Sequence, residues 1–432
     1  MASSHRFPVS HRELIQINVS GPDQAGITAA LTSILAKYDA TILDIGQADV
    51  HHSLAFGILF LTRSDLSGDI LKEILLKTSE LHMQVQFSVI YEKEYQAWVN
   101  LQGQNRYIIT LVGRVINARQ ISAVADIITS QNLNIDAIKR LTGRIPLDPP
   151  VSEEVKESVE TLTHVGAKTP KACIEFSVRG TPKDKELMQS EFMRLASELN
   201  FDISLQEDSM FRRSRRLICF DMDSTLIRTE VIDELADRAG VGEEVRAITE
   251  SAMRGEIDFR ESFTRRVALL KGLDVSVMED IARSLPITEG LPRLMKVLKR
   301  FGYKTAILSG GFTFFGNDLK NRFGFDYVYA NDLEIDEEGK LTGKVKGDIV
   351  DGNRKKELLR LLAQVENIDI RQTIAVGDGA NDLPMLSEAG LGIAFHAKPK
   401  VKAEASQSIS TIGIDGVLYF LGFKDESIAS AV

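Results

Sequence analysis

The sequence predicts an α/β protein whose second half is an open parallel sheet, preceded by two smaller α+β units. Short apolar runs between residues 217 and 395 have the length of buried strands. At least three of them end in polar or glycine-containing loops, at Asp221, Ser309 and Asp378, and such loops follow the carboxyl ends of parallel strands. Residues 11–208 instead show the order strand, helix, strand, strand, helix, strand twice.

The composition is that of a globular chain with several domains. Its 432 residues are too many for one ordinary hydrophobic core. The net charge of −9 argues against general binding to nucleic acid or to an anionic membrane, since either needs a basic face. No apolar run approaches the ~20 residues of a membrane span, and residues 1–11 lack the apolar core of a secretory signal. Cys173 and Cys219 lie in apolar runs, so we expect buried free thiols and a cytoplasmic protein.

The first α+β unit is expected at residues 11–95. An alternating strand leads into a turn with two glycines, Gly21 and Gly26, and a helix with apolar residues at helical spacing follows. The expected strands are residues 13–19, 40–50, 53–62 and 85–91, and the expected helices are residues 27–37 and 68–83. This order is that of a ferredoxin-like fold.

The second α+β unit is expected at residues 104–208. Its strands are expected at residues 106–112, 133–141, 172–178 and 201–206, and its helices at residues 118–130 and 183–200. Residues 142–170 are rich in Pro, Glu, Ser and Thr and longer than compact loops usually are, so we expect a mobile insertion. The basic run 211–216 is expected to be a solvated linker, because nothing nearby extends its charge.

The third domain is expected at residues 212–432 and carries the chemistry. After its first strand, a largely helical stretch at about residues 229–288 is expected to form a cap over the site. Further strands are expected at residues 302–309, 325–329, 373–376 and 391–395, with a hairpin-like excursion at 340–350 and a helix at 355–364.

Four aspartates follow the strands of this domain: Asp221, Asp223, Asp378 and Asp382. So many carboxylates close together would raise one another's pKa or require a cation. An all-oxygen ligand set suits Mg²⁺, and no His or Cys cluster competes with it, because His396 stands alone. The simpler interpretation is that the Asp and Ser residues of the first loop only cap the next helix.

Ser309, Gly310, Gly311 and Lys355 have the chemistry to hold a phosphate group. A hydroxyl, backbone amides and a cation can surround its oxygens. An aspartate nucleophile can form an aspartyl-phosphate, and a second carboxylate can act as general acid and base. The residues therefore predict metal-assisted phosphoryl chemistry.

Four stretches resemble, in combination and order, the motifs of the haloacid dehalogenase superfamily of phosphatases. They are Asp221-Met222-Asp223-Ser224-Thr225, Ser309-Gly310-Gly311, Lys355 and Gly377-Asp378-Gly379-Ala380-Asn381-Asp382. The resemblance covers about residues 212–432 and implies a Rossmann-like core with a helical cap. In the cap, residues 230–239, Met253-Arg254-Gly255, Phe259 and residues 265–270 resemble the phosphoserine phosphatases more narrowly.

The superfamily resemblance implies roles for the motif residues. Asp221 would be the nucleophile and a Mg²⁺ ligand, and Asp223 the acid and base that gives Mg²⁺ its backbone carbonyl. Asp378 would complete the metal site, and Asp382 would steer Lys355 or metal-bound water. The groups that would hold phosphate are Ser309, Gly310, Lys355 and Asn381, with Gly311 in support.

The narrower resemblance implies roles for the cap. Glu230 would meet the substrate ammonium and Arg266 its carboxylate, which a guanidinium grips with two hydrogen bonds. Spacing alone cannot tell whether Arg265 or Arg266 points inward. Met253 and Phe259 would shape the pocket, although both could equally be cap core.

The front units resemble ACT domains, which are small regulatory domains that bind amino acids. The resemblance rests on Gly21-Pro22-Asp23-Gln24-Ala25-Gly26-Ile27 in the first unit. The second unit, with Gly113-Arg114-Val115-Ile116-Asn117-Ala118, lacks the matching second glycine. The family implies an amino-acid effector, often bound across a homodimer. The alternative is that these domains only hold two chains together.

The whole chain thus resembles the long, ACT-bearing form of the phosphoserine phosphatases. That resemblance implies hydrolysis of O-phospho-L-serine, the last step of serine synthesis. The alternatives are another small phosphomonoester such as phosphothreonine, phosphoryl transfer to an acceptor other than water, and a non-catalytic amino-acid sensor on the same scaffold.

Overall fold

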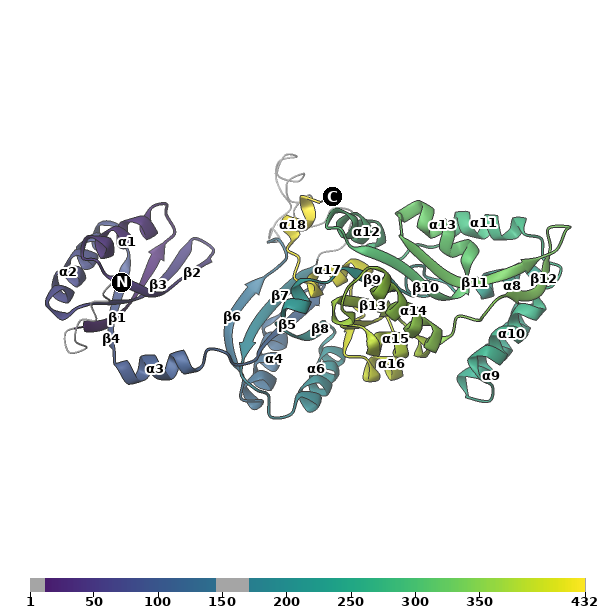
Figure 1. Ribbon diagram of the computed structural model, residues 1–432, viewed down its shortest axis with the longest axis horizontal. Coiled ribbons are helices and arrows are strands. Elements are labelled where there is room, and N and C mark those ends of the chain that lie inside the picture. The colour runs from purple at the N-terminus through teal and green to yellow at the C-terminus, as the bar shows by residue number, and fades with distance from the viewer. Residues whose placement is uncertain (1–11, 145–170, 432) are drawn as a thin grey trace, which may run out of the picture. The chain divides into compact units, whose positions relative to one another are not determined.

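The computed structural model describes residues 12–144 and 171–431 and forms two compact units (Figure 1), with the border between Gln104 and Asn105. Nearly all of the expected insertion, at residues 145–170, lies outside the described residues. The domain boundaries expected from the sequence at 95, 104, 208 and 212 stay predictions. Each unit is described by itself below.

The first unit is a ferredoxin-like repeat, as the sequence predicts. Its sheet has the order β2-β3-β1-β4, with β1 paired antiparallel to both β3 and β4. Alternate residues of the central strand, Ile15, Ile17 and Val19, are buried against the two helices. The elements are β1 Arg12–Pro22, α1 Ile27–Lys37, β2 Thr41–Val50, β3 Ser53–Arg63, α2 Ser64–Glu80 and β4 Gln84–Ile90, followed by α3 Glu92–Asn100, which the sequence analysis missed.

The second unit begins with another ferredoxin-like repeat, with the strand order β6-β7-β5-β8. Its outer strand β8 pairs antiparallel with β15 through Ser408 and Ile203, so this repeat shares one sheet of 11 strands with the rest of the unit. The elements are β5 Arg106–Gly113, α4 Ala118–Ser130, β6 Asn134–Arg140, β7 Ala172–Arg179, α6 Lys185–Leu199 and β8 Asp202–Glu207.

The remaining strands form the expected parallel sheet with β9 near its centre, between β10 and β13. Leu217 and Cys219 of β9 belong to the core on one face, and Ile218 and Phe220 to the core on the other. Burial on both faces explains why the run is continuously apolar. The strands are β9 Leu217–Phe220, β10 Lys304–Phe312, β11 Tyr327–Ile335, β12 Leu341–Lys346, β13 Thr373–Gly377, β14 Leu391–Phe395 and β15 Gln407–Ile409, with β12 antiparallel to β11.

Helices α8–α11, called the cap below, are inserted in the chain between β9 and β10 (Figure 1). They are α8 Val231–Ala239, α9 Gly242–Met253, α10 Phe259–Leu269 and α11 Ser276–Ser284. The other helices are α7 Met210–Arg213, α12 Leu291–Arg300, α13 Thr313–Phe323, α14 Gly352–Val365, α15 Leu383–Glu388, α16 Pro399–Glu404, α17 Val417–Phe420 and α18 Asp425–Ala429, with 3-10 turns at Ile370–Gln372, Ala380–Asp382 and Ile414–Gly416.

The basic run 211–216 is not the solvated linker that the sequence suggests. Arg215 is buried and donates to Gln206 Oε1 at 2.7 Å, and Arg212 lies 3.0 Å from Glu175. The expectation was wrong because folding brings partners to these arginines from β7 and β8, namely Glu175 and Gln206. Burial lowers the pKa of Arg215 to about 10.

Two simpler expectations concern the thiols and the membrane. Cys173 and Cys219 are buried free thiols, as predicted. Among the residues that the structure describes, no helix is both long and apolar enough to cross a lipid bilayer.

Candidate active site

The loop after β9 places two buried carboxylates at the carboxyl end of the central strand. The Asp221 amide donates to the carbonyl of Val376 on the neighbouring β13 at 2.9 Å, so the backbone still follows the sheet at this point. The amide of Met222 then donates to Asp221 Oδ1 at 2.8 Å. Both Asp221 and Asp223 are buried. Hydrogen bonds from the backbone amides of Asp221 and Met222 thus fix the position of Asp221 and of its carboxylate.

Asp221 meets carboxylates from the loop after β13. One oxygen from each of Asp221, Asp378 and Asp382 lies within 4.8 Å of the others. Burial, followed by the charge of Asp382, raises the pKa of Asp221 to about 7, and burial, Asp221 and Asp382 raise that of Asp378 to about 8. Such a cluster of oxygen acceptors fits a divalent cation, whose charge would reverse these shifts.

Lys355 is the cation that the protein itself brings to this cluster. Its buried Nζ lies 2.9 Å from Asp221 Oδ1 and 2.7 Å from Asp382 Oδ1. Burial lowers the pKa of Lys355, but the two carboxylates outweigh burial and the net pKa is raised. Lys355 lies early in α14, whose N-terminus is capped by Asp351 Oδ1 accepting from the Arg354 amide at 2.9 Å. The ammonium group is therefore charged and fixed.

The oxygens of Asp382 have several protein partners. Besides Lys355, Asp382 accepts from the amides of Asp378 at 3.1 Å and Gly379 at 2.9 Å. Asp378 itself accepts only from Thr225 Oγ1, at 2.9 Å, among the contacts of the described residues. Asp221 and Asp378 are thus the freer carboxylates for a metal ion. The expected contribution of the Asp223 backbone carbonyl stays a prediction.

Asp223 has fewer polar partners among the described residues than Asp221 has. Its Oδ1 accepts from the Val231 amide at 3.3 Å, and Oδ2 faces Gly311, where a Cβ atom would lie 2.5 Å away. Burial, the charge of Glu230 and then the charge of Asp221 raise the pKa of Asp223 well above its usual value. A carboxyl group with a raised pKa is suited to donate a proton at neutral pH.

The last residues of β10, where its pairing with β11 shifts register between Leu308 and Phe312, face these carboxylates. Ser309 is buried, and its Oγ accepts from the Gly311 amide at 2.9 Å. A Cβ atom on Gly310 would lie 3.1 Å from Phe259 of the cap, so glycine lets the cap approach this segment. This segment thus meets both the Asp223 loop and the cap, and its contact with phosphate stays a prediction.

Asn331, which the sequence analysis missed, holds this segment in place. Its Nδ2 donates to the carbonyls of Gly310 at 2.8 Å and Gly311 at 3.2 Å, and its Oδ1 accepts from the Val350 amide at 2.8 Å. Asn331 is buried within the largely apolar strand β11, and a lone amide in such a strand was the only signal available in the sequence.

The cap contributes Phe259, Glu230 and Arg266. Phe259 stacks on Phe263 with ring centroids 6.0 Å apart. Glu230 is exposed and accepts from Ser224 Oγ at 2.7 Å. Arg266 is half-buried, and its buried Nε has no partner among the described residues, whereas Arg265 is exposed and pairs with Glu261. The geometry therefore turns Arg266, not Arg265, inward.

The pKa of Arg266 is lowered by burial, while Asp233, Glu230 and Asp223 act against that effect. An ion pair that the sequence analysis missed also joins the cap to the core. Arg260 Nε of α10 donates to Asp351 Oδ2 at 2.6 Å.

Two predicted residues remain, Asn381 and Met253. Asn381 belongs to the 3-10 turn Ala380–Asp382, and its backbone oxygen would lie 2.5 Å from a Cβ atom on Gly352, so it packs against the start of α14. Its contact with phosphate stays a prediction. Met253 is the last residue of α9, and the role expected of its side chain lies outside what the structure describes.

Comparisons with known proteins identify relatives of both units. The haloacid dehalogenase-like hydrolase family matches residues 215–390, and the ACT domain family matches residues 13–88. A phosphoserine phosphatase of Streptomyces coelicolor is 36% identical over 417 residues, which cover 96% of this chain and 93% of the relative. One from Mycobacterium tuberculosis is 36% identical over 419 residues and covers 96% and 95%.

Solved structures agree with these relatives in fold. The crystal structure of a haloacid dehalogenase family hydrolase from Salmonella enterica serovar Typhi has a TM-score of 0.60 and 30% identity. The match covers 73% of this chain and 98% of that one. A crystal structure can therefore be superposed on most of the chain.

Proposed function

The chain belongs to the phosphoserine phosphatases of the haloacid dehalogenase superfamily, with an ACT domain in front, and from that premise we propose how it works. It hydrolyses O-phospho-L-serine to L-serine and phosphate through a covalent phosphate ester on Asp221, with Mg²⁺ as cofactor. The observation that carries this proposal is the position of Asp221. Asp221 directly follows the central strand β9, and its carboxylate lies 2.9 Å from the buried Lys355 ammonium.

In the first step an Asp221 oxygen attacks the phosphorus atom. The bond between phosphorus and the seryl oxygen breaks, and the carboxyl group of Asp223 gives its proton to that oxygen. The raised pKa of Asp223 supports this role, because the group must be protonated before it can donate. L-Serine then leaves, and phosphate remains on Asp221.

In the second step a water molecule attacks the phosphorus of the phospho-aspartyl group. Asp223, now a carboxylate, takes a proton from the water as its oxygen bonds to phosphorus. The bond to Asp221 breaks, which frees inorganic phosphate and returns both aspartates to their starting states. One general acid and base thus serves both steps.

The phosphate oxygens need positive charge and donors. Lys355, Ser309, Gly310 and Asn381 would supply them, with Gly311 leaving room beside Asp223. Mg²⁺, held by Asp221, Asp378 and the backbone carbonyl of Asp223, would offset the repulsion between a carboxylate and a phosphate. Asp382 keeps Lys355 and the Asp378 loop in position.

The cap would recognise the amino-acid part of the substrate. Glu230 would pair with the ammonium group and Arg266 with the carboxylate, while Met253 and Phe259 shape the pocket. The unpartnered buried Nε of Arg266 supports this assignment, because a buried donor without an acceptor costs free energy unless a ligand supplies one.

The first ferredoxin-like repeat would bind an amino-acid effector. A cavity of about 650 Å³ lies at the start of α1, and residues 23–29, Gln47 and Leu54 line it. The N-terminus of α1 has no side-chain cap and no acidic residue in its first turn, so its amides suit a carboxylate. We place the enzyme in the cytoplasm as a homodimer, and serine is the effector to test first.

The test is phosphate release from O-phospho-L-serine with Mg²⁺ and after chelation. We expect Asp221→Asn to lose roughly 10³-fold or more in kcat, as removal of a covalent nucleophile does. Asp280→Asn, an exposed aspartate of the cap, is the matched control and should keep full activity. Turnover that survives both chelation and Asp221→Asn would refute the mechanism.

The cap assignment has a separate test. Arg266→Gln should raise KM for O-phospho-L-serine by about 10–100-fold, the value of charge-assisted hydrogen bonds to a carboxylate. The same variant should leave the turnover of phosphoethanolamine, which has no carboxylate, unchanged. Equal effects on both substrates would show that Arg266 supports the fold rather than the substrate.

A further inference from the structure

The cap is joined to the core by two segments that pair with each other. Ile227 and Ile287 form an antiparallel bridge. The Arg228 amide donates to the Pro286 carbonyl at 2.8 Å, and the Thr288 amide donates to the Leu226 carbonyl at 3.0 Å. Residues 226–228 and 286–288 therefore form one two-stranded connection, called the hinge below, on which any movement of the cap depends.

The first strand of the hinge is tied to the catalytic loop. The amides of Leu226 and Ile227 both donate to the Met222 carbonyl, at 2.8 and 3.2 Å. Met222 stands between Asp221 and Asp223, the proposed nucleophile and acid. A change in the hinge therefore reaches these two carboxylates through two hydrogen bonds and one residue of backbone.

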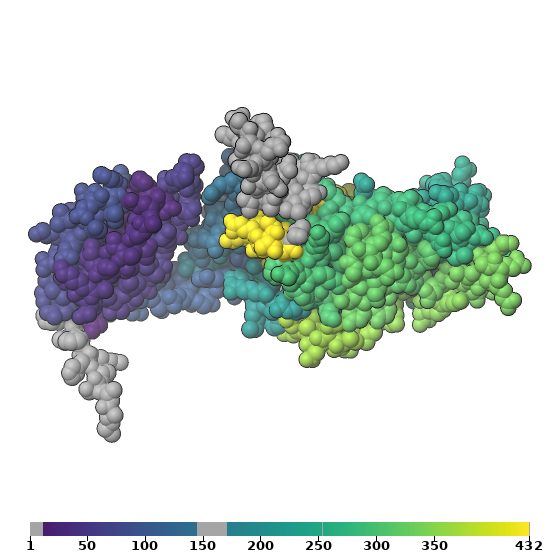
Figure 2. Space-filling view, turned by 90° about the horizontal axis from the view of Figure 1, so that it is seen from above, coloured from purple at the N-terminus to yellow at the C-terminus, as the bar shows by residue number. Residues whose placement is uncertain are grey.

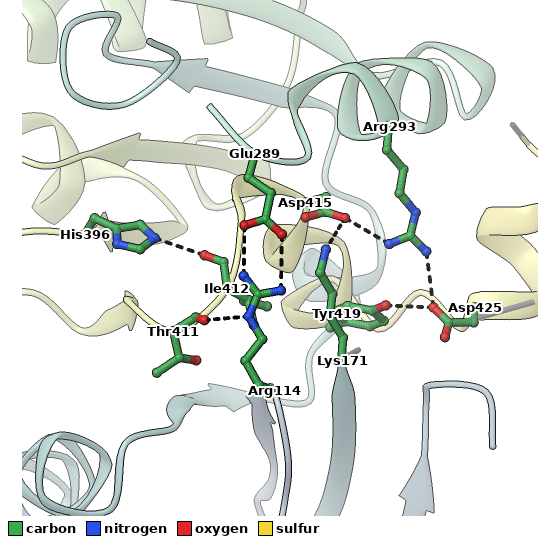
Figure 3. A network of polar contacts seen from close by, with 10 residues as sticks. All are labelled: Arg114, Lys171, Glu289, Arg293, His396, Thr411, Ile412, Asp415, Tyr419 and Asp425. Carbon is green, nitrogen blue, oxygen red and sulfur yellow. Dashed lines mark hydrogen bonds and ion pairs between the residues drawn. The ribbon is translucent and has the colours of Figure 1, made fainter. Parts of the chain in front are cut away.

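The second strand of the hinge leads directly into Glu289, which the second ferredoxin-like repeat grips. Figure 3 shows the Arg114 guanidinium facing the Glu289 carboxylate, with Nη1 to Oε1 at 3.1 Å and Nη2 to Oε2 at 2.8 Å. Arg114 Nε also donates to the Thr411 carbonyl at 3.1 Å. The three contacts fix the plane of the guanidinium, and hence the carboxylate that follows the hinge.

A neighbouring cluster anchors the next turn of the chain. Figure 3 shows Asp415 between Lys171 and Arg293, and Arg293 Nη1 lies 2.9 Å from Asp415 Oδ2. A Cβ atom on Gly290 would lie 2.2 Å from Asp415 Oδ1, so the backbone after Glu289 rests on this carboxylate. In Figure 2 the yellow C-terminal residues lie beside both the blue-teal repeat and the green core.

The two ion-pair systems differ in burial, and this difference separates their roles. The side chains of Lys171 and Asp415 are 1% exposed, whereas those of Arg114 and Glu289 are 33% and 45% exposed. An ion pair in contact with water adds little to the stability of a fold. The Arg114–Glu289 pair therefore contributes mainly by fixing a position, and the position that it fixes is the end of the hinge.

We propose that Arg114 of the second ferredoxin-like repeat is a positioning residue for the phosphatase reaction. Through Glu289 it holds the hinge in the register that lets the cap close over Asp221 and Asp223. The second repeat is thus part of the catalytic unit rather than a regulatory domain only. The inference rests on the proposed function, in which the cap must cover the substrate.

The test compares Arg114→Ala and Arg114→Lys with Arg179→Ala as matched control. Arg179 forms a half-buried ion pair with Asp136 inside the same repeat, and among the described residues its side chain makes no ion pair with the core. Two quantities are measured: kcat and KM for O-phospho-L-serine, and hydrogen exchange of peptides that contain the hinge amides of Arg228 and Thr288. Urea unfolding shows whether each variant is folded.

We expect Arg114→Ala to lower kcat/KM by about tenfold and to speed hinge exchange by about tenfold, the size of typical coupling between linked sites. The urea midpoint should not change. Arg114→Lys keeps one charged contact and should recover part of both effects, and exchanging the charges in Arg114→Glu with Glu289→Arg should recover more than either single variant. Arg179→Ala should leave both quantities as in the wild type.

Unchanged hinge exchange in a folded Arg114→Ala protein would overturn the proposal, and so would the same losses in Arg179→Ala. Hinge exchange is measured without turnover. A wild-type chain that released no phosphate from phosphoserine would contradict the proposed function, and the exchange data would still decide whether Arg114 holds the hinge.

Discussion

The two ferredoxin-like repeats share a strand order but differ in the loop between their first strand and first helix. In the first repeat this loop is glycine-rich, Gly26 has a φ of +94°, and α1 has no side-chain cap. In the second repeat Asn117 Oδ1 accepts from the Gln120 amide at 3.0 Å and closes the N-terminus of α4. The same loop that lines a cavity in one repeat carries Arg114 toward Glu289 in the other.

The outer strands differ in the same direction. β8 of the second repeat is buried, pairs with β15, and its Asp202 accepts from the amides of Ser410 at 2.6 Å and Thr411 at 3.0 Å. β4 of the first repeat has no second strand partner within the described residues of its unit. One topology therefore serves two purposes: the first repeat keeps its loop and edge available, and the second uses both to build the catalytic unit.

The largest effect should come from the buried ion pairs that join the second repeat to the core. Asp415→Asn leaves buried Lys171 without its carboxylate and Arg293 with only Asp425, so it should cost about 3–5 kcal/mol of unfolding free energy. The matched change in the first repeat, Glu73→Gln, removes a partly exposed pair with Lys37 but keeps an acceptor for the Tyr38 hydroxyl, so it should cost less than about 1 kcal/mol. Urea unfolding of both variants makes the comparison, and equal losses would remove this distinction between the repeats.

The next effect concerns the stability of the unit that holds the candidate metal site, which should depend on Mg²⁺ and pH. The raised pKa values of Asp221, about 7, and Asp378, about 8, mean that the folded apo protein binds protons that the unfolded chain has already released. The stability that these groups contribute is therefore fully present below the ordinary aspartate pKa of about 4 and is lost progressively as the pH rises to 7–8. A cation binds the deprotonated form, so Mg²⁺ should stabilise the protein more at pH 8 than at pH 6.

At a Mg²⁺ concentration 100 times Kd the gain should be about 2.7 kcal/mol. Thermal unfolding with and without Mg²⁺ measures it, and only the transition of residues 105–432 should move. Asp378→Asn should abolish most of the gain. A larger shift at pH 6 than at pH 8 would contradict the assigned pKa directions.

A smaller effect tests the open loop of the first repeat. Ala29→Glu places a carboxylate beside the cavity at the start of α1 and should weaken binding of an amino-acid effector by at least about tenfold through like-charge repulsion. Basal turnover should not change. Arg119→Glu, at an exposed site on the corresponding helix of the second repeat, is the control. Calorimetric titration with serine and the other amino acids measures binding.

The smallest effect concerns the closed loop of the second repeat. Asn117→Ala removes a capping box from α4 and should cost about 1 kcal/mol. Urea unfolding of the catalytic unit provides the value. A loss several times larger would mean that this loop also stabilises the contact between the second repeat and the core, and not only its own helix.

The sequence predicts the order of strands and helices along the chain, and the positions of the motifs, because both leave local signals. Alternation and helical spacing mark the repeats, and β9 reads as a continuous apolar run since both of its faces are buried. Asp221, Ser309 and Asp378 were found because each stands at the end of a short apolar run in the sequence. Lys355 needed the family resemblance, since a lysine early in a helix is usually exposed.

The features that the sequence did not reveal depend on contacts between distant residues. β15 has three residues and pairs with β8 through Ser408 and Ile203 alone. Such a short strand has no periodic pattern, so the sequence could not predict that the repeat and the core share one sheet. The burial of Arg215 follows from that sheet. Asn331 and the Arg260–Asp351 pair also join segments far apart in the chain, and only folding brings their partners together.

The most direct measurement compares turnover of O-phospho-L-serine by the full chain and by a chain that starts at Asn105. Residues 105–432 form a compact unit that contains the whole candidate site. Because the first repeat is a separate unit, kcat/KM of the shortened chain should lie within about twofold of the full chain, and any response to amino acids should be lost. A folded shortened chain without activity would contradict the account, because it would place part of the catalytic machinery in the first repeat.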